Sequence, residues 1–335
     1  MSKSGISTLC LEQIGQVKPL IEKSRQKPHR FLLGKLQGDL IVSFWLNEMA
    51  DLFRQQGGEI FVIVKERDIV GMAVYSDLPW DTRVIGNRMG ALKYIVVDPD
   101  SSQKQDTVKQ LLHHVEDWAI SRGIEFLLCK IHTDDMSTVH ALEKRGFLLM
   151  DTLLDCVYDS RRDPLRNVPR PPLPQGFTIR LAGEDDMEEL VAVAQAAFRD
   201  HFGRFHSDQR ISERQAILVY EEWVRSSCEG YADWILVVEI DGKIVGYSVW
   251  KKPSPLEQSL GIRLGHYSIG AIHPNYHGRG LFRALTYAGM ELFEGIADYI
   301  EGPTHINNYS VQRAYTKLRW RICDARHSFH KWLMD

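Results

Sequence analysis

Apolar residues along the chain follow two patterns, which predict strands and helices. An apolar run over 60–64 and a largely apolar run over 235–240 are each followed by a polar turn and a second apolar run that ends at Gly71 or Gly246, so each pair predicts a β-hairpin. A further extended run covers 264–272. Apolar residues at helical spacing predict amphipathic helices in the second half of the chain, over 185–197, 213–226, 281–293 and 310–318.

The two halves of the chain repeat one pattern. Gly71 and Gly246, which end the hairpins, lie 175 residues apart, and so do Pro99 and Pro274 after the next apolar run. A repeat of this length indicates duplicated domains rather than a solenoid. Each half is expected to contain helices, a hairpin, a long strand, a helix, another strand, and a short helix followed by a last strand. In the second half, residues 323–333 are expected to close the sheet.

The segment 159–174 separates the two repeats. It carries five prolines and several charged residues, which disfavour both a helix and a central strand, so an extended linker is expected. We therefore predict a first domain over 1–158, a linker over 159–174 and a second domain over 175–335.

Composition narrows the classes of function. The 335 residues are 44% hydrophobic and 25% charged, as is typical of a soluble globular protein, and a net charge of -3 gives no electrostatic reason to expect a nucleic-acid partner. The five cysteines are scattered, with no Cys-x-x-Cys spacing, so we expect neither a disulfide framework nor a metal site. The polar N-terminus and the absence of a long apolar run favour a cytoplasmic protein without a membrane partner.

One segment carries most of the chemical information. The extended run that ends at Ile272 leads into a polar turn with Gly278 and Gly280, and the turn opens directly into the predicted helix over 281–293. The first backbone N–H groups of a helix have no partner inside it, and the helix dipole favours negative charge, so this arrangement suits a phosphorylated ligand. Arg279 and Arg283 can add charge-assisted hydrogen bonds. The turn is neither a Walker loop nor a dinucleotide fingerprint, because it lacks their further Gly, Lys and acidic positions.

The turn resembles the coenzyme A pyrophosphate loop of the GCN5-related N-acetyltransferases (GNAT), written (Arg/Gln)-x-x-Gly-x-(Gly/Ala). Here His277 stands for the Arg/Gln and Phe282 for the final small residue. The resemblance implies an α/β (α+β) protein with two tandem GNAT folds, each a mixed central sheet flanked by helices, and acetyl-CoA as acyl donor without a metal. The cofactor-binding residues that it implies are Ala271, Ile272, His273, His277, Gly278, Arg279, Gly280, Leu281, Phe282, Arg283 and, on the last helix, Asn308.

The first half has no such turn. At the 175-residue offset, Gly278 and Gly280 correspond to Gln103 and Gln105, and Asp100 and Asp106 lie where a pyrophosphate would have to approach. We therefore predict that residues 1–158 are a copy that has lost coenzyme A binding and that residues 175–335 form the catalytic domain. The alternative is an unrelated α/β domain with a chance likeness.

Acyl transfer to an amine needs a proton donor for the departing thiolate and a proton acceptor for the amine. Tyr315 lies where many members of the family carry the donor, although its helical stripe would also suit a core residue. Candidate acceptors are His266 and Ser268 on one predicted strand and Glu301 and His305 on the next, and we take His266 forward as the second catalytic residue.

A second resemblance suggests which molecule accepts the acetyl group. The segments 197–208 and 219–227 resemble the helical entry of the TDP-fucosamine acetyltransferases, which implies that Arg204, His206 and Asp208 line an amino-sugar pocket; a polar loop between helices is the alternative. Mycothiol synthase, a tandem enzyme that acetylates a cysteinyl amine, and a non-catalytic acyl-CoA sensor remain alternative functions. The expected partner is a small-molecule amine, and a homodimer is left open.

Overall fold

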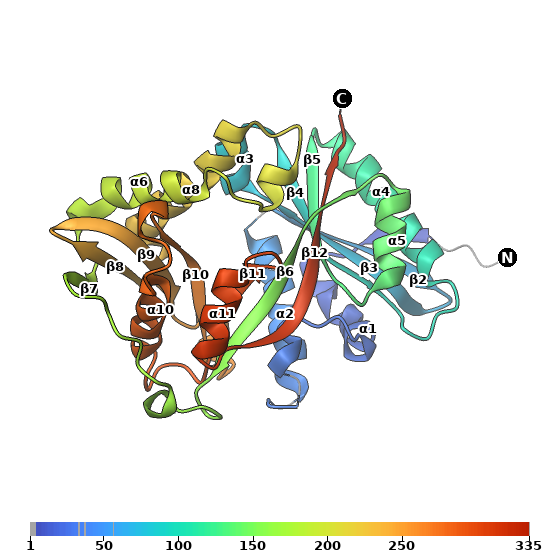
Figure 1. Ribbon diagram of the computed structural model, residues 1–335. Coiled ribbons are helices and arrows are strands. Elements are labelled where there is room, and N and C mark those ends of the chain that lie inside the picture. The colour runs from blue at the N-terminus through green and yellow to red at the C-terminus, as the bar shows by residue number, and fades with distance from the viewer. Residues whose placement is uncertain (1–4, 33, 37, 56, 335) are drawn as a thin grey trace. The chain divides into compact units, whose positions relative to one another are not determined.

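The computed structural model describes residues 5–32, 34–36, 38–55 and 57–334 (Figure 1). The chain forms two compact units: the first holds the residues up to Thr152 and those from Asp324 onward, and the second holds Leu153–Cys323. This division differs from the predicted one, because the last strand of the chain belongs to the first unit and most of the strand before the linker belongs to the second.

The first unit is a mixed sheet with helices on both faces. Its strands follow the order β1 (Gly5–Thr8), β2 (Gly58–Lys65), β3 (Asp68–Asp77), β4 (Met89–Val97), β5 (Phe126–His132) and β12 (Arg321–Trp332). Its helices are η1 (Leu11–Val17), α1 (Lys18–Lys23), η2 (Arg30–Leu32), α2 (Gly38–Arg54), α3 (Pro79–Ile85), α4 (Lys104–Ser121) and α5 (Met136–Lys144). Along β2, Ile60 and Val62 pack with α1 and α2, whereas Phe61 and Ile63 pack with α4. This alternation explains why both faces of the strand are apolar.

The second unit repeats this plan. Its strands follow the order β6 (Leu148–Asp159), β11 (Tyr299–His305), β10 (Leu264–Ile272), β9 (Lys243–Lys251), β8 (Trp234–Ile240) and β7 (Phe177–Leu181). Its helices are η3 (Leu165–Asn167), η4 (Glu184–Asp186), α6 (Met187–Phe198), α7 (Arg204–Ser207), α8 (Glu213–Ser226), η5 (Ser227–Tyr231), α9 (Pro255–Ser259), η6 (Pro274–Tyr276), α10 (Leu281–Glu291) and α11 (Tyr309–Lys317). The predicted hairpins and the predicted mixed sheet with flanking helices are confirmed.

Both sheets contain a fork between two parallel strands. In the second unit β10 and β11 pair from Leu264↔Tyr299 to His266↔Glu301 and then part, although both strands continue. In the first unit β4 and β5 pair only as far as Leu92↔Cys129. A β-bulge follows each fork, at Lys93 in β4 and at Ser268 in β10. The two bulges lie 175 residues apart, so the repeat offset predicted from the sequence holds in the structure.

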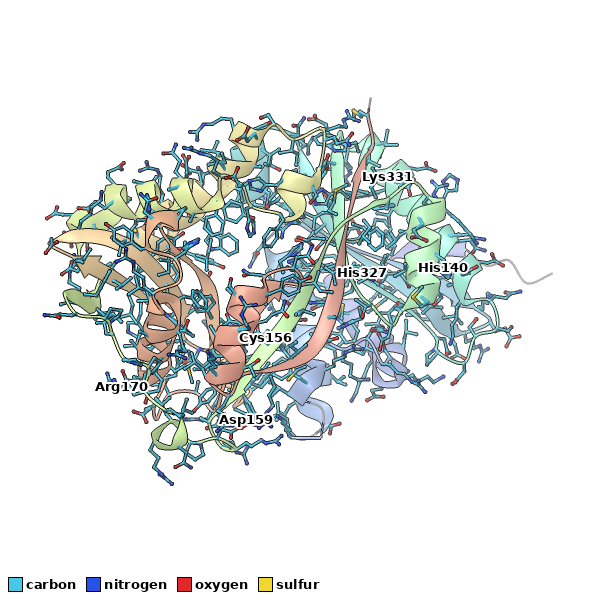
Figure 2. The ribbon with its side chains drawn as sticks, in the orientation of Figure 1. His140, Cys156, Asp159, Arg170, His327 and Lys331 are labelled. Atoms are coloured by element: carbon cyan, nitrogen blue, oxygen red, sulfur yellow. The ribbon has the colours of Figure 1, made fainter. Side chains whose placement is uncertain are left out.

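The two units exchange their last strands. β12 pairs with β5 from Arg326↔His132 to Trp332↔Phe126, and β6 pairs with β11 from Leu153↔His305 to Asp159↔Tyr299. The prediction that residues 323–333 close the second sheet is therefore wrong. β6 and β12 occupy equivalent positions in the repeat, at an offset of 173, so their similar patterns do not reveal which sheet each joins. Figure 2 labels Cys156 and Asp159 on β6 and His327 and Lys331 on β12.

Phe329 on β12 provides a test of this exchange. Its side chain is fully buried in the core of the first unit. Phe329→Ala should lower the free energy of unfolding by about 3–5 kcal/mol, and hydrogen exchange should show lost protection in β5. The matched control is Cys156→Ala at the equivalent position of β6, where protection should be lost in β11. Loss of protection in β11 caused by Phe329→Ala would contradict the exchange.

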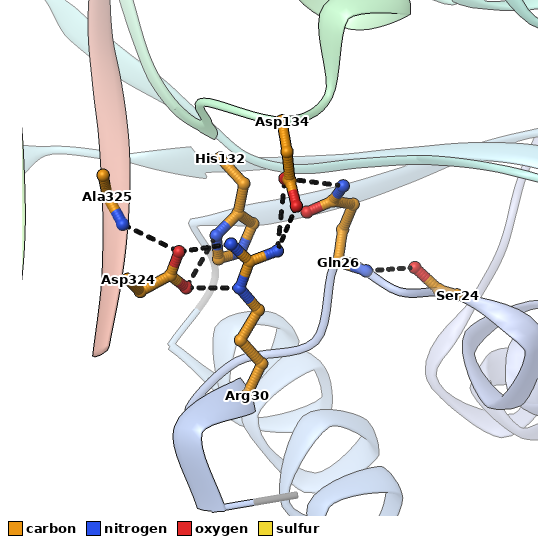
Figure 3. Close-up of polar contacts among 7 residues, drawn as sticks. All are labelled: Ser24, Gln26, Arg30, His132, Asp134, Asp324 and Ala325. Atoms are coloured by element: carbon orange, nitrogen blue, oxygen red, sulfur yellow. Dashed lines mark hydrogen bonds and ion pairs between the residues drawn. The ribbon is translucent and has the colours of Figure 1, made fainter.

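A polar network fastens β12 in the first unit (Figure 3). The Arg30 guanidinium donates from Nε to Asp324 Oδ2 at 2.6 Å and also pairs with Asp134. His132 Nδ1 lies 2.9 Å from the same Asp324 oxygen, and the Ala325 N–H donates to the other oxygen. Burial alone would raise the pKa of Asp324, but the hydrogen bonds from His132 and Arg30 outweigh it and lower the pKa to about 2.

This network predicts a pH-dependent contribution to stability. The folded-state pKa of Asp324 is lowered, so its contribution is complete above the unfolded-state value of about 3.9 and disappears as the pH falls to about 2. Asp324→Asn should therefore cost about 2 kcal/mol in unfolding free energy at neutral pH, and the difference from wild type should shrink between about pH 4 and pH 2. Denaturant titrations over this range measure it, with the exposed Asp68→Asn as control. A difference independent of pH would contradict the assignment.

Candidate functional site

The predicted phosphate turn is shaped by two histidines. β10 ends at Ile272, and the short helix η6 and the turn connect it to α10. His273 Nδ1 accepts the Asn275 N–H at 3.3 Å, and His277 Nε2 lies 2.8 Å from the Ile272 carbonyl oxygen, to which it donates. The imidazole rings of His273 and His277, both predicted cofactor residues, therefore shape the turn.

The backbone conformation of the turn favours glycine at two positions. Gly278 and Gly280 have φ angles of 78° and 80°, in the left-handed region that favours glycine, and a Cβ at either position would meet no atom within 4 Å. The first hydrogen bond of α10 runs from the Ala284 N–H to the Gly280 carbonyl, so the N–H groups of residues 281–283 precede it. Open space beside a helix N-terminus suits a diphosphate.

Two arginines flank this space. Arg279 lies over the Tyr276 ring at 5.4 Å. Arg283 has a buried Nε with no hydrogen-bond partner among the described residues, and a phosphate oxygen would satisfy it. Ala271, Ile272 and Leu281 are buried, so only their backbone is available to a ligand. The centre of the Phe282 ring lies 6.2 Å from that of the Tyr315 ring and 6.4 Å from that of the Tyr267 ring. The residues present therefore fit a coenzyme A diphosphate.

The equivalent turn of the first unit differs in conformation. α4 begins at Lys104 after Gln103, whose φ is -112°, and the Asp100 N–H donates to Asp98. The Gln103 side chain accepts a hydrogen bond from Lys65 at 2.8 Å. Within 98–106, which the structure describes in full, no residue adopts a left-handed φ. The turn of the first unit, which has no glycine, therefore lacks the backbone shape of the second.

Tyr315 lies on α11 with a buried phenol. The ring stacks on Trp320 with centroids 4.6 Å apart, and a Cβ placed on Gly302 of β11 would lie 2.9 Å from its hydroxyl. The hydroxyl has no hydrogen-bond partner within the part of the chain that the structure describes. Burial raises its pKa well above the ordinary value, so the phenol keeps its proton at neutral pH. Tyr315 is thus both a core residue, as one interpretation predicts, and a protonated group at the fork.

His266 is held between two carboxylates. Its Nδ1 lies 2.9 Å from Glu301 Oε1 and its Nε2 lies 3.0 Å from Glu257 Oε2. Burial alone would lower the pKa of His266, but the hydrogen bonds to Glu257 and Glu301 outweigh it and raise the pKa to about 10. The ring is therefore an imidazolium at neutral pH with both nitrogens engaged. This geometry does not fit the predicted role of His266 as the base.

Asn308 caps α11. Its side-chain oxygen accepts the Val311 N–H at 3.4 Å and the Ser310 hydroxyl at 3.0 Å. Asp135 caps α5 in the same way at the equivalent position of the first unit. The oxygen of Asn308 is used by the helix, and only its amide NH₂ is left to act as a donor to a ligand. Its predicted contact with the cofactor stays a prediction.

The predicted acceptor residues lie on and next to α7. The Arg204 guanidinium lies over the Phe205 ring at 4.5 Å, and buried Asp208 accepts the Arg210 N–H at 3.0 Å. His206 packs near Tyr220, and burial lowers its pKa. These contacts are those of a packed loop, which was the alternative interpretation, and a substrate role for the three residues stays a prediction.

Two contacts connect the helical side of the unit to the fork. The Phe202 ring lies 4.6 Å from the His305 ring on β11, and the Trp223 indole donates to the Ser268 hydroxyl at 3.1 Å. Sequence reasoning missed Glu257. Its only signal is the Ser254-x-x-Glu257 capping box, which the structure forms and which predicts a helix start rather than a site.

Two further observations concern membrane spans and metal ions. No helix among them is long and apolar enough to cross a membrane. They also contain no cluster of three or more His, Cys, Asp or Glu side chains arranged for a metal ion.

Comparison with known proteins gives this forked mixed sheet and its glycine turn a context. Residues 25–147 match the model of the Acetyltransferase (GNAT) family. The mycothiol acetyltransferase of Salinispora arenicola is 32% identical over 138 residues, which are 40% of each chain. The spore coat polysaccharide biosynthesis protein SpsD of Bacillus subtilis is 19% identical over 284 residues, 78% of this chain and 84% of that protein.

Solved structures share the whole fold. A GCN5-related N-acetyltransferase from Sphaerobacter thermophilus has a TM-score of 0.66 and 15% identity, covering 99% of this chain and 96% of that chain. A tandem GNAT protein from the clavulanic acid biosynthesis pathway has a TM-score of 0.59 and 12% identity over 99% of both chains. Residues 25–147 of the chain thus match the GNAT acetyltransferase family, and the whole chain shares a tandem GNAT fold with these solved structures. The match to the family model lies in the first unit, so the cofactor site in the second unit stays a prediction.

The asymmetry of the two turns predicts one coenzyme A site per chain. Calorimetric titration with acetyl-CoA should give a stoichiometry near one. Gly280→Asp should abolish binding, because it adds a negative charge and a strained side chain where the diphosphate would lie. The matched control is Gln105→Asp at the equivalent position of the first unit, which should leave affinity unchanged. Two equivalent sites, or equal losses in the two variants, would exclude this assignment.

Proposed function

We propose that the chain is an N-acetyltransferase that moves the acetyl group of acetyl-CoA to a primary amine of a small molecule. The observation that carries the proposal is the combination, in one unit, of a glycine turn open to a diphosphate, a forked strand pair and a buried phenol beside the fork. The match of residues 25–147 to the Acetyltransferase (GNAT) family supports it.

Acetyl-CoA, the acetyl donor, would be held along β10. The N–H groups at the start of α10, with Arg279 and Arg283, would bind the diphosphate. Beyond His266 the edge of β10 that faces β11 is no longer used in their pairing, so its N–H and C=O groups can bind the amides of an extended arm. When bound, acetyl-CoA supplies an activated acetyl thioester. Tyr315 would then give its proton to the leaving sulfur.

The comparisons favour one acceptor class over the other. Relatives named mycothiol acetyltransferase match at 25–33% identity, which supports a cysteinyl amine on a polar carrier as the acceptor. The amino group of a nucleotide-linked amino sugar is the second candidate, and the similarity to SpsD over most of both chains supports it. The expectation of a TDP-fucosamine-like acceptor stays with this second candidate.

Turnover with a panel of amines tests the function. The full chain would be mixed with acetyl-CoA and with cysteinyl-amine conjugates or nucleotide amino sugars, and release of free thiol would be followed alongside the mass of the product. Acetylation of the cysteinyl amines with a kcat/KM at least about tenfold higher is expected. A preference for amino sugars would select the second candidate. Tight binding of acetyl-CoA without turnover of any amine would identify a sensor instead.

Tyr315→Phe tests the proton donor. The variant keeps the stacked ring and removes the proton, so kcat should fall by about 10² to 10⁴ while the affinity for acetyl-CoA stays nearly constant. Because the buried hydroxyl has no partner, the melting temperature should not fall. Tyr287→Phe, a buried phenol on α10, is the control. A kcat within a factor of about three of wild type, with the chemical step shown to be rate-limiting, would leave Tyr315 as a core residue only.

A further inference from the structure

A pocket lies in the second unit at the start of β10, whereas the glycine turn follows the end of this strand. Its volume is about 220 Å³, which is far more than the roughly 10–15 Å³ that one water molecule needs. Its walls come from the end of α10, the starts of β10 and β11, the end of β6, and the segment 160–165, which folds back onto this face. We call it the linker pocket. All of its walls belong to the second unit.

The floor of the linker pocket is apolar and buried. It is formed by Met290 and Phe293 at the end of α10, by Ala297 and Ile300 at the start of β11, and by Leu165 of the folded-back segment. A ligand with an apolar body would remove water from this floor, and burial of apolar surface is the main favourable contribution to binding in small-molecule sites.

The rim of the linker pocket is acidic. Glu294 is exposed there, and its carboxylate forms no hydrogen bond or ion pair with any residue that the structure describes. The carboxylate of Asp298 is already engaged, because Arg263 Nε donates to it at 3.2 Å. Arg263 also donates from Nη2 to the Gly295 carbonyl at 2.8 Å. The charges of Arg263 and Asp298 therefore offset each other, and that of Glu294 is left.

The phenol of Tyr158, in the wall of the pocket, lies in the same acidic surroundings. Its hydroxyl donates to the Asp163 carbonyl at 2.5 Å. Burial raises the pKa of Tyr158, and the negative charges of Asp163, Glu294 and Asp159 raise it further. The arginines within 161–166 do not line the pocket. Helix α10 also ends here, and the C-terminal end of a helix dipole favours a positive charge.

The first unit does not carry this acidic rim. Two ring contacts align the units at this point, because Phe293 packs on Trp250 and, 175 residues earlier, Trp118 packs on Tyr75. The residue that follows in the first unit, Ala119, is fully buried, so the position of the rim carboxylate has no charge there. The rim thus depends on residues of the second unit and not on the repeated fold.

The linker pocket and His266 lie on opposite faces of the sheet. Ile300 pairs with Tyr158 across β11 and β6, and both side chains line the pocket. Side chains alternate along a strand, so Glu301, which contacts His266, points to the other face. The pocket is therefore separate from the groups beside the fork.

We propose that the linker pocket is a second binding site, which takes a small organic ammonium ion with an apolar body. The apolar body lies on the buried floor, and the ammonium group pairs with the Glu294 carboxylate at the rim. This inference does not rest on the proposed function, because the pocket needs neither acetyl-CoA nor turnover to bind its ligand.

Calorimetric titration of the full chain with benzylammonium chloride, without acetyl-CoA, tests the charge preference. The expected dissociation constant is about 1 mM or lower. Benzyl alcohol, which has the same ring without the charge, should bind about fivefold more weakly. Glu294→Gln should weaken benzylammonium binding by the same factor and leave benzyl alcohol binding unchanged. The matched control is Glu291→Gln on the same helix, whose carboxylate pairs with Arg170 and which should bind as wild type does.

Ser160→Leu tests the pocket itself. The Ser160 N–H donates to the Asp298 carbonyl at 2.9 Å, and at the equivalent position of the repeat the Leu333 N–H donates to the Glu125 carbonyl at 2.8 Å. The fold therefore accepts leucine at this position. The larger side chain should occupy part of the pocket and weaken the binding of both benzylammonium and benzyl alcohol, whereas Glu294→Gln weakens that of the ammonium alone.

The indole of Trp320 locates the bound ligand. Its N–H donates to the sulfur of Met290, which lines the pocket, at 3.3 Å. The NMR signal of this N–H, assigned by its loss in Trp320→Phe, should shift with the same saturation curve as the calorimetric titration.

Three results would each overturn the proposal. They are saturable binding of benzylammonium that leaves the Trp320 signal in place, equal affinity for benzyl alcohol, and wild-type affinity in both Ser160→Leu and Glu294→Gln. None of them bears on the proposed function, which the turnover assay with acetyl-CoA decides by itself.

Discussion

The site depends on the point at which β10 and β11 stop pairing. Up to His266↔Glu301 they are neighbours in a parallel sheet, and beyond it each presents polar backbone groups to the gap between them. Unpaired backbone groups are costly to bury. A ligand that carries its own hydrogen-bonding groups could pair with these backbone groups. The glycine turn follows the outer end of this stretch of β10, and His266 and the phenol of Tyr315 contact β11 at or next to its last paired residue.

The exchanged strand β6 supports β11 at the fork. β11 lacks a partner on one edge after Glu301, but on its other edge β6 pairs with it over its whole length, from Asp159↔Tyr299 to Leu153↔His305. The strand that carries Glu301 and contacts Tyr315 is therefore held by a strand that precedes the linker in sequence. In the first unit β12 does the same for β5, and the Arg30–Asp324 ion pair adds a fixed point where β12 joins that unit.

The sequence predicts those features that depend on local pattern. Helix α8 was expected over 213–226 and spans Glu213–Ser226, because a Ser212 cap and an amphipathic repeat define it locally. The glycine turn was found for the same reason. The exchange of β6 and β12 could not be predicted, since equivalent strands have equivalent patterns and only tertiary packing separates them. The surroundings of His266 could not be predicted, because no spacing rule links it to Glu257 and Glu301, which contact its two ring nitrogens.

The first unit has the same fold with different residues beside its fork. Its fork and its bulge at Lys93 are present, and its residues 25–147 match the acetyltransferase family model. At the positions equivalent to His266, Glu301 and Tyr315, however, it carries Ala91, Leu128 and Leu142, all buried. No ionisable group and no phenol is retained at these three positions. A fork is therefore a property of the fold, whereas the ionisable groups beside it depend on individual residues, and at these three positions they are present in the second unit and replaced by apolar residues in the first.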